Sequence, residues 1–299
     1  MSGWLSGYQS VLNVVLLNCG LALSQFVVLR AGVFSVASPA LASIGAYTAG
    51  ILTLRTGAPL AVGLAAAAAT GTLTALILSV PLARLRGVFQ AIATVAFAQI
   101  VLSLALYATD LTGGANGLNA IPRLVDTPGL VLWIAAVVYV LVCLSRARIG
   151  YAFDAIQQDE TVAVTLGISA ARYQALAFAL SGAIAGVSGA LMAYHNRSVA
   201  PEEFGFGMLV TVLAYVVLGG RRSVLGPLAG ATILSLLPEL ARPLADNRLI
   251  VHGAVLMLVI TYLPHGFVDS LKIAYRRRST RGHDDTLTKE AADGPARAG

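Results

Sequence analysis

Long apolar runs, separated by short polar stretches, constrain this chain more than any other feature. Several runs reach the roughly 20 residues that an α-helix needs to cross about 30 Å of hydrocarbon. Because the bilayer core offers the backbone no hydrogen-bond partners, such runs predict helices that satisfy their own backbone groups. The sequence therefore predicts an all-α polytopic membrane protein with about 8–10 transmembrane helices. The candidate spans cover residues 10–28, 36–54, 59–82, 88–108, 128–145, 175–194, 206–219, 224–241 and 249–265.

Composition agrees with this class and argues against a nucleic-acid partner. Of the 299 residues, 57% are hydrophobic and 11% are charged, which is more apolar than a soluble domain requires. The net charge of +6 comes from basic residues that stand singly or in pairs between apolar runs, and from a cluster near the C-terminus. Such spacing is typical of membrane topology signals and not of a DNA-binding surface.

The basic residues also predict an orientation. Only five of the 20 Lys and Arg residues fall on one side of the predicted spans. The positive-inside rule assigns the richer side, which includes the C-terminus, to the cytoplasm. We expect a transmembrane domain over residues 1–271 and a basic, disordered cytoplasmic tail over residues 272–299. The five residues on the poorer side are Arg55, Arg123, Arg197, Arg242 and Arg248.

One polar island, GYAFDAIQQDETVAVTLGIS at residues 150–169, interrupts the apolar pattern. Its apolar residues recur at helical spacing, and Gly167 stands where a helix would end. We expect a short amphipathic helix from about Asp154 to Leu166, lying outside the bilayer. Its apolar stripe must pack on the membrane domain, lie at the lipid interface or fit a groove in another protein. Because its polar arc carries acids and glutamines instead of Lys and Arg, a protein partner is favoured.

Proline and glycine mark other special positions within the spans. The segments around Pro39 and before Gly219-Gly220 are expected to be broken or re-entrant, because such residues survive at membrane depth where protein or a cavity satisfies the backbone. Gly182 and Gly186 form a GxxxG pattern with Gly189 nearby, which allows close helix approach. Tight static packing is the favoured interpretation, and a sliding surface between gating helices is the alternative.

Little in the chain suggests chemistry of its own. The span interiors lack Asp, Glu, Lys and Arg, which disfavours an ion-driven transporter. No GxxxxGK[ST] motif occurs, so nucleotide hydrolysis would require another polypeptide. Cys19 and Cys143 lie far apart in apolar runs and support neither a disulfide nor a metal site. Glu202 and Glu203 fit either a solvated external loop or a contact with a docked receptor.

The polar island resembles the cytoplasmic coupling loop, here about residues 146–172, of permease subunits in ATP-binding cassette (ABC) importers of the branched-chain amino acid type. Gly150, Asp159, Glu160, Ala163 and Leu166-Gly167-Ile168 carry the resemblance. Further motifs of the high-affinity branched-chain amino acid permease family follow in order along the chain. They are AGVFSVASPALASIGAYTAGIL (31–52), LRGVFQAIATVAFAQI (85–100), LTGGANGL (111–118), LAFALSGAIAGVSGALMAY (176–194), VVLGGRRSVLGPLAGA (216–231), LLPELAR (236–242) and Pro-His-Gly-Phe (264–267).

This resemblance implies a transport subunit without catalytic activity, cofactor or metal, in the cytoplasmic membrane of a bacterium or archaeon. It implies as partners a second related permease, two ABC ATPase subunits and an extracytoplasmic solute-binding protein. The implied solute is small and amino-acid-like, with branched-chain amino acids expected first and urea, amides and aromatic acids left open. A stand-alone secondary transporter or channel for a small neutral solute is the alternative.

Two groups of site residues are expected from this reading. The residues expected to couple to the ATPases are Asp154, Ile156, Asp159, Glu160, Ala163, Leu166 and Gly167. The candidates for lining the pathway are Gln90, Thr94, Gln99 and Ser181.

Overall fold

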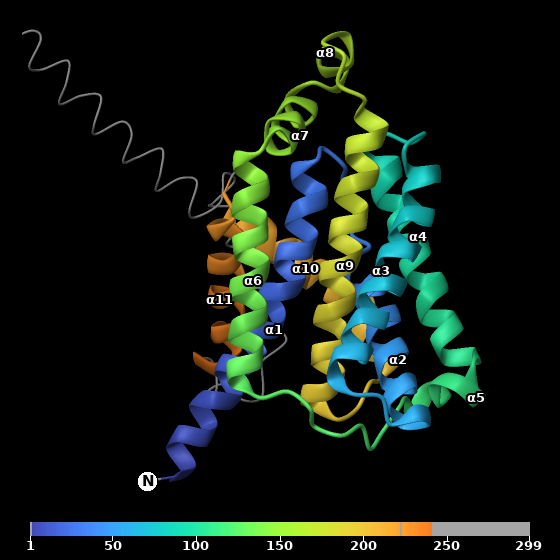
Figure 1. The fold of residues 1–299 in the computed structure, drawn as a ribbon, viewed down its shortest axis with the longest axis vertical. Coiled ribbons are helices and arrows are strands. Elements are labelled where there is room, and N and C mark those ends of the chain that lie inside the picture. Colours follow the sequence, from blue (N-terminus) through green and yellow to red (C-terminus); the bar gives the residue numbers. More distant parts are fainter. Residues whose placement is uncertain (1, 222, 241–299) are drawn as a thin grey trace, which may run out of the picture.

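The computed structural model describes residues 2–221 and 223–240, and every regular element in them is a helix (Figure 1). The all-α polytopic class is thereby confirmed. The elements are α1 (Ser2–Arg30), α2 (Ser38–Thr56), α3 (Leu60–Leu82), α4 (Val88–Tyr107), α5 (Thr109–Thr112), η1 (Gly114–Asn116), α6 (Thr127–Arg146), α7 (Arg148–Gln158), α8 (Glu160–Thr165), α9 (Ala170–Asn196), η2 (Pro201–Phe204), α10 (Phe206–Gly219) and α11 (Leu225–Leu240).

Each of the first eight predicted spans corresponds to one helix. Five helices are long and apolar enough to cross a membrane: the Gln9–Arg30 part of α1, and α3, α4, α6 and α9. Two apolar helices, α10 and α11, are shorter. The ninth predicted span, 249–265, and the predicted tail, 272–299, lie outside the described residues.

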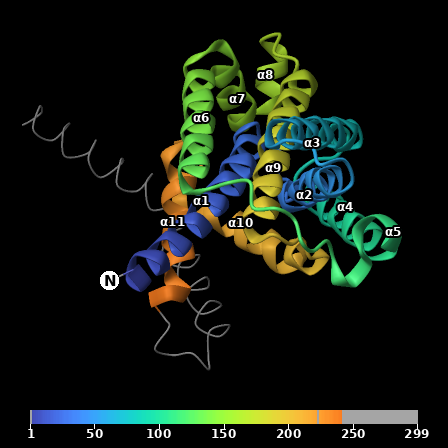
Figure 2. The same cartoon turned by 60° about the horizontal axis from the view of Figure 1, so that its bottom comes forward.

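The helices lie side by side in two groups joined by α1 and α9. These two helices pack against each other, with α6 and α11 beside α1 and with α2 and α3 beside α9 (Figure 2). The fourth helix, α4, lies outside α2 and reaches the rest of the molecule mainly through α2, η1 and η2. The short helices α7 and α8 cover one end of the bundle, and α5 lies at the opposite end (Figure 1).

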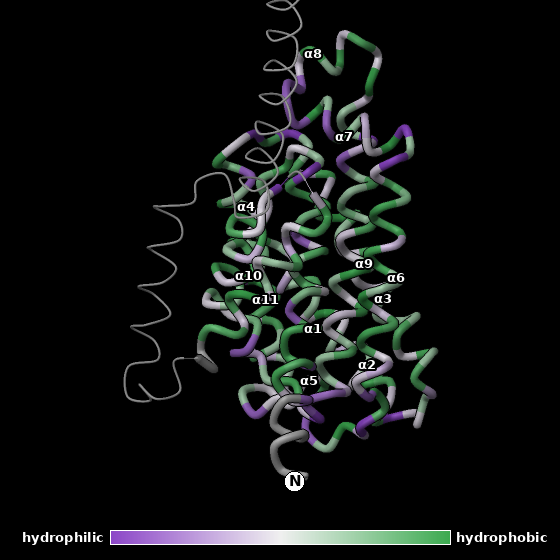
Figure 3. Tube along the Cα trace, turned by 90° about the vertical axis from the view of Figure 1, so that its left-hand side faces the viewer, coloured by the Kyte–Doolittle hydropathy of each residue, from purple (hydrophilic) through white to green (hydrophobic). Residues whose placement is uncertain are grey.

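Polar residues gather at these two ends, while the middle of the molecule is apolar (Figure 3). At the α7–α8 end, α1 finishes at Arg30, α6 finishes at Arg146 and α7 starts at Arg148. The opposite end carries Arg55 near the end of α2 and Arg197 after α9. The distribution of basic residues between the two sides of the membrane, as predicted from the sequence, therefore agrees with the direction in which successive helices run.

Glycines allow the closest helix packing in the molecule, where α2, α3 and α9 meet. A Cβ added at Gly182 would overlap the carbonyl oxygen of Gly71 in α3, and one at Gly189 would overlap that of Ala42 in α2. Gly186 contacts both neighbours, because a Cβ there would overlap Ala67 of α3 and its own backbone faces Gly45 of α2. The predicted close approach thus involves two partner helices at once.

The connection between α1 and α2, residues 31–37, is irregular but largely buried. Its backbone is bonded by side chains from two helices: the Phe34 N–H donates to Gln90 Oε1 at 3.2 Å, the Val36 N–H donates to Thr94 Oγ1 at 3.2 Å, and the Gln25 side chain donates to the Ser35 carbonyl. This support allows irregular backbone to lie inside the bundle.

The predicted break around Pro39 is wrong for the helix itself. Pro39 lies in the first turn of α2, where a missing N–H costs nothing, and the helix continues unbroken to Thr56. The irregular segment precedes the proline. The helix before Gly219-Gly220 is also unbroken, but it is only 14 residues long.

Candidate functional site

The polar island forms two helices at one end of the bundle. The first, α7, ends at Gln158, and the second, α8, starts at Glu160. Between them Asp159 has extended backbone angles, and its carboxylate accepts the N–H groups of Thr161 at 2.8 Å and Val162 at 3.1 Å. The single helix predicted from Asp154 to Leu166 is therefore wrong, because Asp159 caps a new helix instead of continuing the old one.

Gly167 ends α8 as predicted. Its φ of +84° lies in the left-handed region that favours glycine. The Ile168 N–H donates to the Ala163 carbonyl at 3.0 Å, and the Gly167 N–H donates to the Val164 carbonyl at 3.0 Å. This pair of bonds is a Schellman motif, which turns the chain sharply toward α9.

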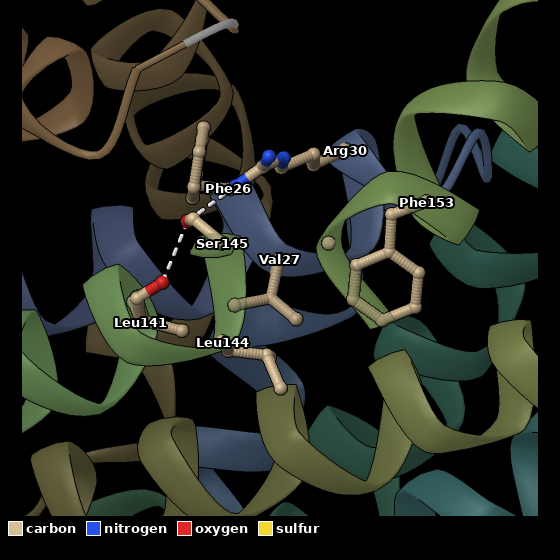
Figure 4. A pocket seen from close by; sticks show the side chains of 8 residues that line it. Phe26, Val27, Arg30, Leu141, Leu144, Ser145 and Phe153 are labelled. Carbon is tan, nitrogen blue, oxygen red and sulfur yellow. Dashed lines mark hydrogen bonds between the residues drawn. The ribbon is translucent and has the colours of Figure 1, made fainter. Parts of the chain in front are cut away.

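Arg30, the last residue of α1, fastens α7 to the membrane helices. Its Nε lies 2.9 Å from Asp154 Oδ1 and its Nη2 lies 3.0 Å from Asp154 Oδ2, so the ion pair is bidentate. Its Nη1 also donates to Ser145 Oγ at 2.6 Å, near the end of α6 (Figure 4). One guanidinium therefore joins α1, α6 and α7, in the geometry that makes such pairs strong.

Apolar contacts fix the inner face of both short helices. Ile156 of α7 and Ala163 of α8 are buried together with Ala170 of α9. Phe153 also packs edge-on against Tyr173 of α9, with ring centroids 6.3 Å apart. Figure 4 shows Phe153 beside a small pocket that Val27 and Leu144 also line. The α7–α8 hairpin is thus seated on α1, α6 and α9.

Several apolar side chains of the hairpin are left uncovered by the described residues. Val162 and Val164 are each 53% exposed, Leu166 is 73% exposed and Tyr151 is 70% exposed. The nearby Arg86–Glu160 pair is loose, at 3.6 Å, with an exposed Arg86 and a half-buried Glu160. We name Tyr151, Val162, Val164 and Leu166 the outer apolar patch.

The residues expected at the coupling site therefore have different surroundings. Leu166 belongs to the outer apolar patch, and Glu160 lies beside it. Ile156 and Ala163 are buried where the hairpin packs on the spanning helices, and Asp154 forms an ion pair with Arg30. The anchoring role of Arg30 was not predicted. Its isolated position after the first apolar run was interpreted only as a signal of topology. Tyr151, Val162 and Val164 were also missed, because periodicity alone did not say which apolar residues would be covered.

The four pathway candidates do not come together in the structure. Gln90 and Thr94 are buried and bonded to the 31–37 connection. Ser181 is buried in α9, where its hydroxyl lies 2.9 Å from that of Ser24 in α1. Gln99 alone is exposed, on α4. Three of these side chains therefore hold the bundle together in the conformation described.

The α9–α10 connection, which was predicted as an external loop, folds back against the helices. Val199 pairs with Leu118 through two backbone hydrogen bonds of 2.9 Å, and η2 then packs against α2, α4 and α10. Phe204 is buried in the same cluster as Tyr47 of α2, whereas Glu202 and Glu203 remain exposed. Within residues 2–221 and 223–240, no group of three His, Cys, Asp or Glu side chains is arranged to hold a metal ion.

These features define a multi-pass helical membrane protein with a helical hairpin fastened to the ends of its spanning helices. Residues 8–260 match the model of the family described as "Branched-chain amino acid transport system / permease component". The chain belongs to this family of transport permeases.

Two permeases named LivM, of the "high-affinity branched-chain amino acid transport system", are similar to this chain. The protein from Salmonella typhimurium is 31% identical over 286 residues and that from Escherichia coli is 32% identical over 292 residues; both alignments cover 84% of this chain. The chain spans about two thirds of the length of these relatives, at 66%. The E. coli permease named LivH is 29% identical over 149 residues, or 48% of each chain. No solved structure gives a significant match.

Proposed function

We propose that this chain is the membrane-spanning permease subunit of an ABC importer, and that it moves a branched-chain amino acid into the cytoplasm. ATP is hydrolysed on separate subunits, because the chain has no phosphate-binding motif of its own. The partners are a second related permease, two ATPase subunits and an extracytoplasmic solute-binding protein. The similarity to both LivM and LivH, two permeases of one named transport system, supports a pair of related permeases.

The outer apolar patch is the observation that carries this proposal. An apolar surface on a helix end that no part of the described chain covers indicates a protein contact. The polar arc of the hairpin bears Glu160 and Asp159, so anionic lipid is a poor alternative partner. In our proposal the ATPases bind the patch, and their closure on ATP pushes the hairpin.

The contacts that hold the hairpin on the spanning helices would transmit this movement into the membrane. Arg30 joins α7 to α1 and α6, and the buried Ile156 and Ala163 join the hairpin to α9. Movement of the hairpin therefore acts on three spanning helices, and it switches access to the pathway between two states.

Orientation follows from the same assignment. The α7–α8 end, which carries most of the basic residues, faces the cytoplasm of a bacterium or archaeon. The α5 end, with the Leu118–Val199 pairing, faces the solute-binding protein.

The test is reconstitution of the chain with its second permease, ATPases and binding protein in liposomes. Leu166→Glu should abolish copurification of the ATPases and ATP-dependent uptake of L-leucine. Leu124→Glu, which alters an exposed leucine at the opposite end, should leave ATPase copurification unchanged. Glu160→Gln and Gly167→Ala should weaken uptake, because they alter the contact and the turn that positions it.

Normal ATPase binding and uptake in the Leu166, Glu160 and Gly167 variants together would contradict the coupling role. Uptake of leucine by the purified chain alone, without ATP, would instead establish a stand-alone transporter or channel.

A further inference from the structure

The α9–α10 connection brings a carboxylate into the membrane-embedded part of the molecule. Helix α10 has 14 residues and is therefore about 21 Å long, which is short of the roughly 30 Å of hydrocarbon. Its second half extends toward the α7–α8 end, since α10 contacts α1 and Val216 belongs to the same buried cluster as Phe26 and Val27 in the last turns of α1. The start of α10 must then lie inside the membrane, and η2 immediately precedes it.

Contacts of the neighbouring residues agree with that depth. Phe204 shares a buried cluster with Tyr47, which lies in the middle of the 19-residue helix α2. Leu209, one turn into α10, belongs to the same buried cluster as Val36 and Ala40, at the start of α2. Because η2 contacts α2, α4 and α10 and immediately precedes the short α10, it packs against the spanning helices instead of projecting away from them.

Glu203 belongs to η2. Its side chain is exposed in the chain as described, and it forms no ion pair there. Helices α1 to α4, α6, α9 and α10 contain no Asp or Glu. A carboxylate facing lipid at this depth is costly, so it marks a water-filled pathway or a polar contact.

The Tyr47 hydroxyl is a second, independent indication of a ligand. The residue is 94% buried, at 6% relative exposure, and its hydroxyl has no hydrogen-bond partner among the described residues. It lies on α2, which η2 contacts. Buried hydroxyls are normally hydrogen-bonded, so an orphaned one on a helix that contacts η2 suits a ligand that carries hydrogen-bond donors.

We propose that Glu203 of η2, together with the Tyr47 hydroxyl of the contacting helix α2, binds the ammonium group of the transported amino acid on its way through the membrane domain. This inference rests on the proposed function, because it takes the solute to be an amino acid. An ammonium group supplies a positive counter-charge for the Glu203 carboxylate and a hydrogen-bond donor for the Tyr47 oxygen. Other surfaces of the assembly would contact the carboxylate and the side chain of the solute.

The experiment uses the complete transporter in liposomes and measures ATP-dependent uptake of radiolabelled L-leucine. Glu203→Gln keeps the size of the side chain and removes its charge, and it should lower uptake at least tenfold while the subunits still copurify. Glu203→Asp should retain more uptake than Glu203→Gln, and Tyr47→Phe should give a smaller loss. Glu202→Gln is the matched control on the same short helix, and it should stay within twofold of wild type.

A labelling measurement covers the case in which Glu203→Gln does not assemble. In a background where Cys19 and Cys143 are replaced by serine, Glu203→Cys should react with a water-soluble thiol reagent, and excess leucine with its binding protein should slow the reaction. A position 203 that cannot be labelled would overturn the subsite.

The remaining outcomes separate the two proposals. A wild-type complex without leucine uptake would overturn the proposed function and the subsite with it. An active wild-type complex in which Glu203→Gln behaves like Glu202→Gln would overturn the subsite alone.

Discussion

At the scale of single residues, Arg30 and Asp154 hold the α7–α8 hairpin in place. The Arg30 side chain is only 11% exposed, and its bidentate partner is 45% exposed. Removing the carboxylate leaves a largely buried guanidinium with only Ser145 as a partner, and a buried charge without its counter-ion is costly. The Arg86–Glu160 pair nearby is mostly exposed and should contribute little.

We therefore expect Asp154→Ala to destabilise the detergent-solubilised chain by about 1–3 kcal/mol, seen as a lower midpoint of thermal unfolding. Glu160→Ala should cost less than about 1 kcal/mol. Equal shifts for the two variants would contradict the anchoring role of Asp154.

Two glutamines of α4 give a second comparison. Gln90→Leu leaves the Phe34 N–H without its acceptor inside the bundle, so it should cost about 1–3 kcal/mol in the same unfolding measurement. Gln99→Leu alters a side chain that is exposed, and it should leave the unfolding midpoint unchanged. A loss of stability in both variants would mean that Gln99 also has a structural role.

These residues show why polarity alone did not identify a pathway. A glutamine or threonine inside an apolar run can line a cavity or support irregular backbone, and the sequence pattern is the same in both cases. Gln90 and Thr94 bond to residues about 56 positions away, Phe34 and Val36. Only the fold brings these residues together, so the backbone-supporting role was not predictable from the local sequence.

At the scale of elements, the α2–α3–α9 packing depends on glycine. Gly186→Ala should destabilise the chain by about 1–3 kcal/mol, because its Cβ would overlap the Ala67 carbonyl oxygen of α3. Gly207→Ala in α10 is the matched control, since a Cβ there meets nothing within 4 Å. Unfolding midpoints of the two variants test the difference, and a tolerated Gly186→Ala would show that α9 can move away from α3.

The elements also show the limits of the hydrophobic pattern. Apolar length predicted the position of each spanning helix in the described residues, because the pattern needs no partner to be visible. The division of the island at Asp159 was missed, although an acidic residue followed by Glu160 and an apolar run is typical of a helix start. The inward fold of η2 was missed, although the shortness of the span 206–219 was visible in the sequence, because the burial of Phe204 depends on the fold.

At the scale of the whole molecule, orientation in the membrane can be tested directly. In a background without Cys19 and Cys143, Val162→Cys should react with a membrane-impermeant thiol reagent only in inside-out vesicles. Leu124→Cys, on the connection between η1 and α6, should react only from the outside of intact cells. Both positions are exposed, so reaction of both from the same side would contradict the topology.

The hydroxyl contact between Ser24 and Ser181 has a mechanical consequence. It joins α1 and α9 at a buried point, below the attachments of the hairpin at Arg30 and Tyr173. Together with the glycine packing against α2 and α3, this contact holds the interior of α9, so a sideways push on one end of α9 would tilt the helix instead of sliding it along its axis. The arm of α9 from Ser181 to Asn196 is about 23 Å long, against about 17 Å from Ala170 to Ser181. A small sideways displacement of the Ala170 end of α9 would therefore become about a third larger at the Asn196 end.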